Sequence, residues 1–130
     1  MVNIGSDIAG TSYDAATANW GVPWRMPSLA QWQELHDKCT YVWTSKNGVS
    51  GWKFTGLNGG TIFLPPTGSR VNSEQDTLGW SGFYWSSTLC DIYPVSFYED
   101  GAWGLYFSWE RVNLTTYGHR YHGHSVRPVR

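Results

Sequence analysis

Charge and cysteine are both scarce in this chain, and each scarcity argues against a class of function. Charged residues make up 15% of the 130 residues and the formal net charge is -1, so no basic stretch indicates nucleic-acid binding. The two cysteines, Cys39 and Cys90, are too few for the disulfide framework of a small secreted domain. We expect both to be free thiols, with a bond between them as the alternative.

Long apolar runs are missing as well. No stretch approaches the roughly 20 consecutive apolar residues of a transmembrane helix. The opening MVNIGSDIAGTSYDAATANW lacks the basic start and apolar run of a secretory signal. We therefore expect a single domain over residues 1–130, with no membrane insertion and no signal peptide on this chain, long enough to bury a core without covalent cross-links.

The stretch from Trp24 to Cys39 has the period of an amphipathic helix. Ser28 is a suitable N-cap, and Gln31 follows three residues later, as in a capping box. A shorter helix is expected over Thr11–Asn19, ended by a glycine and a proline. The apolar residues that share one face of the longer helix, and should pack on a sheet, are Leu29, Trp32, Leu35 and Cys39.

After Thr40 the pattern changes to alternation interrupted by glycine-rich turns, which favours antiparallel strands. Asn47-Gly48 between two alternating runs predicts a type I′ hairpin turn, and Asn58-Gly59-Gly60 predicts a second turn. The polar stretch Thr67–Leu78 is expected to be a surface loop. Later strands are expected over Ser81–Thr88, which should be central, over Ala102–Trp109 and over His124–Val129.

The last third of the chain combines a core pattern with a contact pattern. Side chains on a strand alternate between its two faces, so one set is expected in the core and the other on a binding surface. Tyrosines interleaved with small polar residues resemble the composition of an antibody paratope. Recognition is therefore predicted, and catalysis is not. The two sets are Trp103, Leu105 and Phe107 for the core, and Gly104, Tyr106 and Ser108 for the surface.

The binding surface is expected to include the long loop after Thr88, because loops of that length are more often functional than accidental. No cofactor and no metal are predicted. The predicted ligand-binding residues are Asp91, Ile92, Tyr93, Val95, Ser96, Phe97, Tyr98, Gly104, Tyr106, Ser108, Arg111, Thr115, Thr116, Tyr117, Gly118, His119, Tyr121 and His122.

Three histidines near the C-terminus suggest an alternative, a zinc site or a histidine-dependent hydrolase. His122 and His124 would share one face of a strand, with His119 close by in sequence. No carboxylate or cysteine completes a recognisable zinc spacing. We expect imidazoles that contact a ligand, with the metal site as the alternative.

Several separated motifs, in order along nearly the whole chain, resemble the FISUMP family, the major paralogous domain of bacterial surface proteins. They are YDAATANWGVPWRMPSLAQWQEL, GVSGWKFTGLNGGTIFLPPTGSR, YWSS and the ending R-x-x-G-x-SVRPV. That family is similar to a branch of the C-type lectin fold, in the variant shared with formylglycine-generating enzyme. The resemblance implies an α+β fold in which two short helices flank a small twisted antiparallel sheet with long loops.

The C-terminal alternation is also similar to the variable proteins of diversity-generating retroelements. There, adenine-directed mutagenesis rewrites Asn codons near the end of a C-type lectin domain, and such codons cannot become Lys, Gln, Met, Trp or Glu. Between Cys90 and His122 the chain has no Lys, Gln or Met. The variable region would cover about residues 90–122, with Glu99, Trp103, Trp109 and Glu110 fixed or separately encoded.

These resemblances imply a hypervariable receptor-binding domain on a phage tail fibre or a bacterial surface. Its partner would be a protein or glycan on a cell surface, and oligomeric or multivalent display would strengthen weak single sites. One alternative is a structural or adhesive surface module without diversification. Another is an enzyme of the formylglycine-generating type, but Cys39 and Cys90 do not reproduce its reactive cysteine pair, and the calcium-dependent sugar-binding triplets of lectins are missing.

Overall fold

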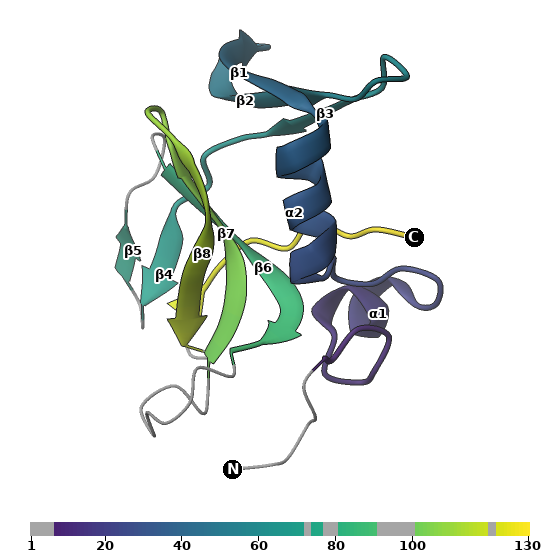
Figure 1. The fold of residues 1–130 in the computed structure, drawn as a ribbon. Helices are drawn as coiled ribbons and strands as arrows, with labels where there is room; N and C mark the ends of the chain where they lie inside the picture. The colour runs from purple at the N-terminus through teal and green to yellow at the C-terminus, as the bar shows by residue number, and fades with distance from the viewer. Residues whose placement is uncertain (1–6, 72–73, 77–80, 91–100, 120–121) are drawn as a thin grey trace.

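The computed structural model describes residues 7–71, 74–76, 81–90, 101–119 and 122–130, with only the backbone for residues 69–71, 74–76, 115–119 and 122 (Figure 1). These residues form an α+β arrangement of two helices and three antiparallel three-stranded sheets, β1-β2-β3, β5-β4-β9 and β6-β7-β8. The elements are α1 (Ala15–Trp20), α2 (Leu29–Lys38), β1 (Thr40–Lys46), β2 (Val49–Thr55), β3 (Thr61–Leu64), β4 (Ser69–Val71), β5 (Glu74–Asp76), β6 (Ser81–Leu89), β7 (Gly101–Ser108), β8 (Val112–His119) and β9 (His122–Gly123).

Helix α2 lies between the first sheet and the third (Figure 1). Its predicted capping box is confirmed, because the Gln31 backbone N–H donates to Ser28 Oγ at 3.2 Å and the Ser28 N–H donates to Gln31 Oε1 at 2.9 Å. The helix begins at Leu29, directly after this cap. It is shorter than the predicted stretch, since the residues from Trp24 to Pro27 precede the cap.

The core forms where α2 meets both sheets. Trp32 of α2 packs against Tyr84, and Tyr84 stacks on Phe107 with ring centroids 6.0 Å apart. The Trp32 indole N–H donates to the Trp85 carbonyl at 3.2 Å, so the polar edge of the ring is satisfied. The buried cluster consists of Trp32, Trp52, Phe54, Leu64, Tyr84, Leu105 and Phe107.

The first sheet follows the predicted hairpins. Asn47 and Gly48 both have positive φ, 52° and 81°, as a type I′ turn requires. The register then pairs Trp43 with Trp52 across β1 and β2. In this sheet the sequence expectation is confirmed, because the turn residues sit where the alternation on each side needs them.

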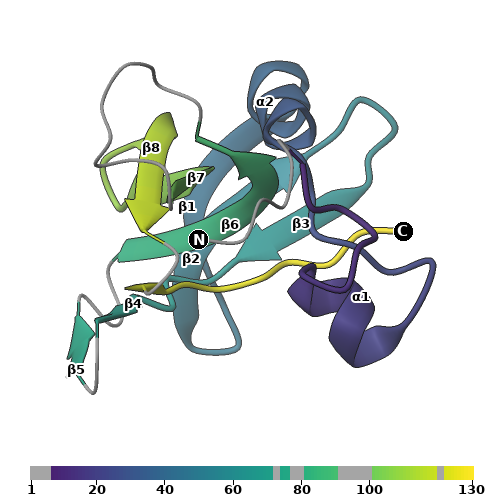
Figure 2. The ribbon, with the colours of Figure 1, turned by 90° about the horizontal axis from the view of Figure 1, so that it is seen from below.

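Strand β6 is flanked on both sides, which confirms its predicted central place. On one side it pairs with β7. On the other side the C-terminal segment returns along it, where the Trp85 N–H donates to the Ser125 carbonyl at 2.9 Å and the Ser125 N–H donates to the Phe83 carbonyl at 3.0 Å (Figure 2). The C-terminal segment thereby ties the last residues to the middle of the fold.

Two elements differ from the sequence expectation. The predicted surface loop Thr67–Leu78 contains β4 and β5, and β4 pairs with β9 through Arg70 and Gly123. A three-residue strand with its partner some fifty residues away leaves no local signal. The stretch His124–Val129 was predicted as a strand but makes only isolated bridges, at Ser125 and Val129.

Asp14 holds the N-terminal region together, although the sequence pattern did not mark it. It is fully buried and caps α1, and its carboxylate also accepts a hydrogen bond from the Met26 N–H at 2.9 Å. Burial alone would raise its pKa, but backbone N–H donors from Met26, Gly10, Thr17 and Ala16 outweigh burial and hold the pKa below the ordinary value. The ionised form of Asp14 is therefore part of the fold.

Three strand glycines accommodate aromatic rings from a neighbouring strand. A Cβ added to any of them would lie between 2.5 and 2.8 Å from the nearest ring carbon, which is too close for a real contact. These glycines are required by packing, although the sequence reading treated glycine as a turn signal. The pairs are Gly51 with Phe63, Gly82 with Phe107 and Gly104 with Phe83.

Both cysteines are free, Cys39 half-buried and Cys90 buried, in agreement with the sequence expectation. Neither helix within the described ranges combines the length and the apolar character that crossing a membrane demands.

Candidate ligand-binding face on β7 and β8

The ribbon formed by β7 and β8 carries the described part of the predicted binding surface. Leu105 and Phe107 are both 0% exposed and belong to the core, as the alternation predicts. Trp103 is only half-buried and lies outside the core cluster, so its predicted place in the core is corrected. Alternation identifies which residues share a face, but not how far the core extends along the strand.

Gly104 lies on the opposite face from Leu105 and is buried. A Cβ at this position would lie 2.5 Å from Phe83 Cε1 and 2.6 Å from the Tyr84 carbonyl oxygen. Position 104 is therefore explained by the packing of the Phe83 ring. We leave Gly104 out of the binding face for that reason, contrary to the sequence expectation.

Aromatic packing covers part of the face that the sequence assigned entirely to ligand contact. The His124 ring stacks on Phe83 with centroids 3.9 Å apart, and the edge of Trp85 lies against His124 at 4.6 Å. Trp85 is half-buried here and stands outside the core cluster. Both faces of this small sheet are thus partly covered.

Tyr106, Ser108 and Arg111 are the predicted contact residues whose described side chains reach solvent. Tyr106 is half-buried, in a strand position paired with Phe83 on one side and Asn113 on the other. Arg111 is exposed in the turn between β7 and β8. Tyrosine and arginine are both enriched in protein-binding surfaces.

Ser108 shapes that turn. Its N–H donates to the Arg111 carbonyl at 3.0 Å, and its hydroxyl accepts from the Glu110 N–H at 3.3 Å. Its carbonyl accepts from the Trp52 indole N–H at 2.8 Å, which fastens the turn to the first sheet. The described bonds give Ser108 a structural role, and ligand contact by its hydroxyl would have to be additional.

Trp109 is an exposed aromatic residue that the predicted binding surface did not include. It is 59% exposed at the tip of the β7–β8 turn, next to Glu110 and two residues from Arg111. The reading placed it at the end of the alternating strand and, on the coding argument, among fixed residues. Glu110 and Arg111, the two charged residues directly after Trp109, are the sequence signal that could have placed Trp109 in a turn.

Strand β8 is an edge strand in the described part of the chain, bonded to β7 alone. Its backbone places Tyr117 opposite Trp103 and Thr116 opposite Gly104, and the register shifts between Gly104 and Tyr106. The predicted contact residues on this backbone are Thr115, Thr116, Tyr117, Gly118 and His119, with His122 on β9. The predicted residues outside the described ranges are Asp91, Ile92, Tyr93, Val95, Ser96, Phe97, Tyr98 and Tyr121.

The described side chains near this face offer little chemistry beyond contact. Within the ranges that the structure describes, no three His, Cys, Asp or Glu residues gather closely enough to hold a metal ion. Burial raises the pKa of Tyr84, whose hydroxyl donates to the Pro65 carbonyl at 2.8 Å. That phenol is therefore a neutral hydrogen-bond donor in the core and has no role at the surface.

Comparison of the chain with protein-family models, with curated proteins and with solved structures yields no match. The function is therefore inferred from the residues and their arrangement. What they offer in this region is a buried framework, an exposed turn and an edge strand.

Proposed function

We propose that this chain is the hypervariable ligand-binding domain of a diversity-generating retroelement target protein, with a C-type lectin fold of the formylglycine-generating-enzyme-like variant. It acts by binding and not by catalysis. Its variable residues lie within residues 91–98, at the outer positions of β7, in the turn around Arg111 and on strand β8. The domain is displayed on a phage tail fibre or on a bacterial surface.

One observation carries this proposal. On β7 the framework residues Leu105 and Phe107 are fully buried, while the turn immediately after them exposes Trp109 and Arg111. Substitution at the exposed positions leaves the core contacts intact, because these side chains make none of them. Diversification requires surface residues that can be substituted without unfolding the domain.

The fold assignment is supported by the motif order and by two features of the structure. Two short helices accompany small antiparallel sheets, and the C-terminal segment returns beside β6 at Ser125. The motif SVRPV, part of the resemblance to the FISUMP family, begins at this same Ser125. The C-terminal motif that contributes to the resemblance therefore has a structural role, because its Ser125 backbone hydrogen-bonds to β6.

The partner is a protein or glycan on a cell surface. A few aromatic and arginine anchors would provide most of the affinity, with truncation of each costing about 1 to 3 kcal/mol of binding free energy. Trp109, Tyr106 and Arg111 are the described residues of these types on the face. Multivalent display would then raise the avidity of weak single sites.

Binding is tested by labelling the domain, presented as a multimer, and measuring its attachment to a panel of bacterial cells. The double variant Tyr106→Ala with Arg111→Ala should lose attachment and melt within about 1 kcal/mol of the parent. Tyr13→Ala is the matched control, because Tyr13 is 55% exposed and precedes α1, far along the chain from this face. Equal loss of attachment in the control would remove the binding face from β7 and the turn.

Diversification is tested separately, in the flanking genome. A near-copy of the last hundred or so bases, differing at adenines and next to a reverse-transcriptase gene, is expected. If the cells are bound but no such copy exists, the domain is an adhesive surface module with a fixed binding face.

A further inference from the structure

The outer face of the first sheet has the residues of a second binding site. The register places Val42, Lys53 and Phe63 in one row across β1, β2 and β3, so these side chains share a face. The opposite face carries Trp52 and Leu64 into the core. The row is therefore turned away from the core.

Phe63 forms an apolar floor on this face. Its ring lies over Gly51 of the neighbouring strand, where an added Cβ would be 2.8 Å from Phe63 Cζ and 2.5 Å from the Leu64 carbonyl oxygen. Because Gly51 has no side chain, the tip of the half-buried Phe63 ring can approach the backbone of β2. Phe63 is one of the residues that line a pocket on this face.

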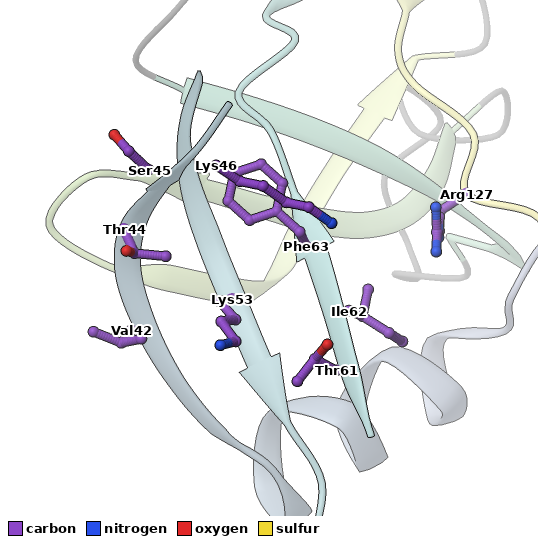
Figure 3. Close-up of a pocket in the computed structure, with 9 residues that line it drawn as sticks. All are labelled: Val42, Thr44, Ser45, Lys46, Lys53, Thr61, Ile62, Phe63 and Arg127. Carbon is purple, nitrogen blue, oxygen red and sulfur yellow. The ribbon is translucent and has the colours of Figure 1, made fainter. Parts of the chain in front are cut away.

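Three cations line the pocket together with Phe63. Lys46 comes from β1 and Lys53 from β2, while Arg127 reaches the pocket from the C-terminal segment beyond β3 (Figure 3). All three are exposed, and the hydroxyls of Thr44 and Thr61 also line the pocket. Among the described residues no ion pair of Arg127 is found.

The charge around the pocket is of one sign. Among the residues that the structure describes, no Asp or Glu lines it, and the chain has no acidic residue between Asp37 and Glu74. The basic residues are spaced widely along the sequence, but the fold gathers three of the nine in one place. The potential over the pocket is therefore positive although the whole chain carries a formal charge of -1.

The pocket has a volume of about 590 Å³, within the range of small-molecule sites. A pyranose ring has an apolar C–H face that can lie on an aromatic ring, and hydroxyls that bond to threonine side chains. A carboxylate or sulfate on that ring would meet the ammonium and guanidinium groups of the rim. One or two sugar rings fit this combination of floor, hydroxyls and cations.

We propose that this pocket, formed by β1, β2, β3 and Arg127, binds an acidic sugar residue, one that carries a carboxylate or a sulfate. A single-stranded nucleic acid fits less well, because sequence-independent binding of a strand uses a groove with several stacking rings and the pocket offers one. The site is separate from the β7–β8 face and does not depend on it.

The probes are 3′-sialyllactose, a sulfated heparin disaccharide and neutral lactose, with binding followed by calorimetry and by amide chemical shifts. At least one acidic sugar should bind, more weakly as salt is raised, and shift the β2 and β3 resonances. Lys53→Gln should weaken binding about fivefold, in line with an exposed charge contact. Phe63→Leu should weaken binding also. Whichever acidic probe binds more tightly shows whether the pocket prefers a carboxylate or a sulfate on the sugar.

Lys38→Gln is the charge-matched control, since Lys38 is exposed at the end of α2 and does not line this pocket. It should bind like the parent, as should the Tyr106→Ala, Arg111→Ala double variant. Each variant is checked by its thermal melt, so loss of fold is distinguished from loss of a contact. The proposal is overturned if neither acidic sugar binds at millimolar concentration, if lactose binds equally well, if a DNA oligonucleotide binds more tightly than both, or if Lys38→Gln matches Lys53→Gln.

Discussion

The outer face of the first sheet and the β7–β8 face reach solvent in different ways. On the first sheet the exposed residues depend on one another, because Phe63 approaches β2 only where Gly51 has no side chain, and three cations line the same pocket. On the second, Trp109 and Arg111 project from a turn whose shape is held by Ser108 and by the buried Phe107.

The two faces differ in which of their positions tolerate substitution. A preformed pocket restricts its own residues, since a new side chain at Gly51 or Phe63 alters the floor. A turn supported from beneath leaves its exposed residues free, because their replacement disturbs no packing. Within one small domain, the first arrangement suits a fixed small ligand and the second suits a changing large one.

The largest effect is expected at the framework beneath the variable face. Phe107→Ala removes a fully buried ring that packs on Tyr84 and over Gly82, and should lower the unfolding free energy by about 3 to 5 kcal/mol. Chemical denaturation measures it. A loss below about 1 kcal/mol would mean that the framework does not hold the face in place.

A slightly smaller loss of unfolding free energy is expected at Asp14, which belongs to neither face. Substitution there tests whether the two faces unfold together as one cooperative unit. Asp14→Asn should cost about 2 to 3 kcal/mol, because backbone donors lose a charged acceptor. The folded pKa lies below the ordinary 3.8, so the ionised carboxylate stabilises the fold above that value and ceases to as pH falls through the folded pKa.

Denaturation from about pH 5 to about pH 2 should therefore be less steeply pH-dependent in Asp14→Asn than in the parent. Asp7→Asn is the control, since Asp7 is exposed. Both faces should melt together in every variant. Separate transitions, followed through amide signals of β2 and β7, would divide the chain into independent units.

The glycines beneath the rings should give an intermediate effect that compares the faces directly. Gly51→Ala and Gly104→Ala each force a Cβ against a ring and a backbone oxygen, and each should cost about 1 to 3 kcal/mol. Only Gly51→Ala should also abolish binding of the acidic sugar. Equal effects of both variants on that ligand would show that the two faces are coupled.

The smallest effect is expected at the tip of the variable face. Trp109→Ala should change the unfolding free energy by no more than about 0.5 kcal/mol, because the ring is mostly in solvent. Attachment to cells should nevertheless fall, since exposed tryptophan is a frequent anchor. A large loss of stability would instead make Trp109 part of the scaffold, and position 109 would then be unsuited to variation.

The sequence alone was enough for the elements whose signals are local. The Ser28 and Gln31 cap, the Asn47-Gly48 turn and the alternating Leu105 and Phe107 are each specified by residues a few positions apart. Backbone geometry links such neighbours directly, through a cap three residues long, a turn of two and a period of two. Those features were predicted and are found.

Only the tertiary structure decided which surfaces are free and which residues gather on them. Gly104 is covered by a ring from β6, β4 pairs with β9, and Arg127 joins lysines from a distant hairpin. Asp14 likewise accepts one of its hydrogen bonds from the Met26 N–H, 12 residues away. Each of these features depends on contacts between residues remote in sequence. A local period or turn signal does not indicate which remote residues will be in contact.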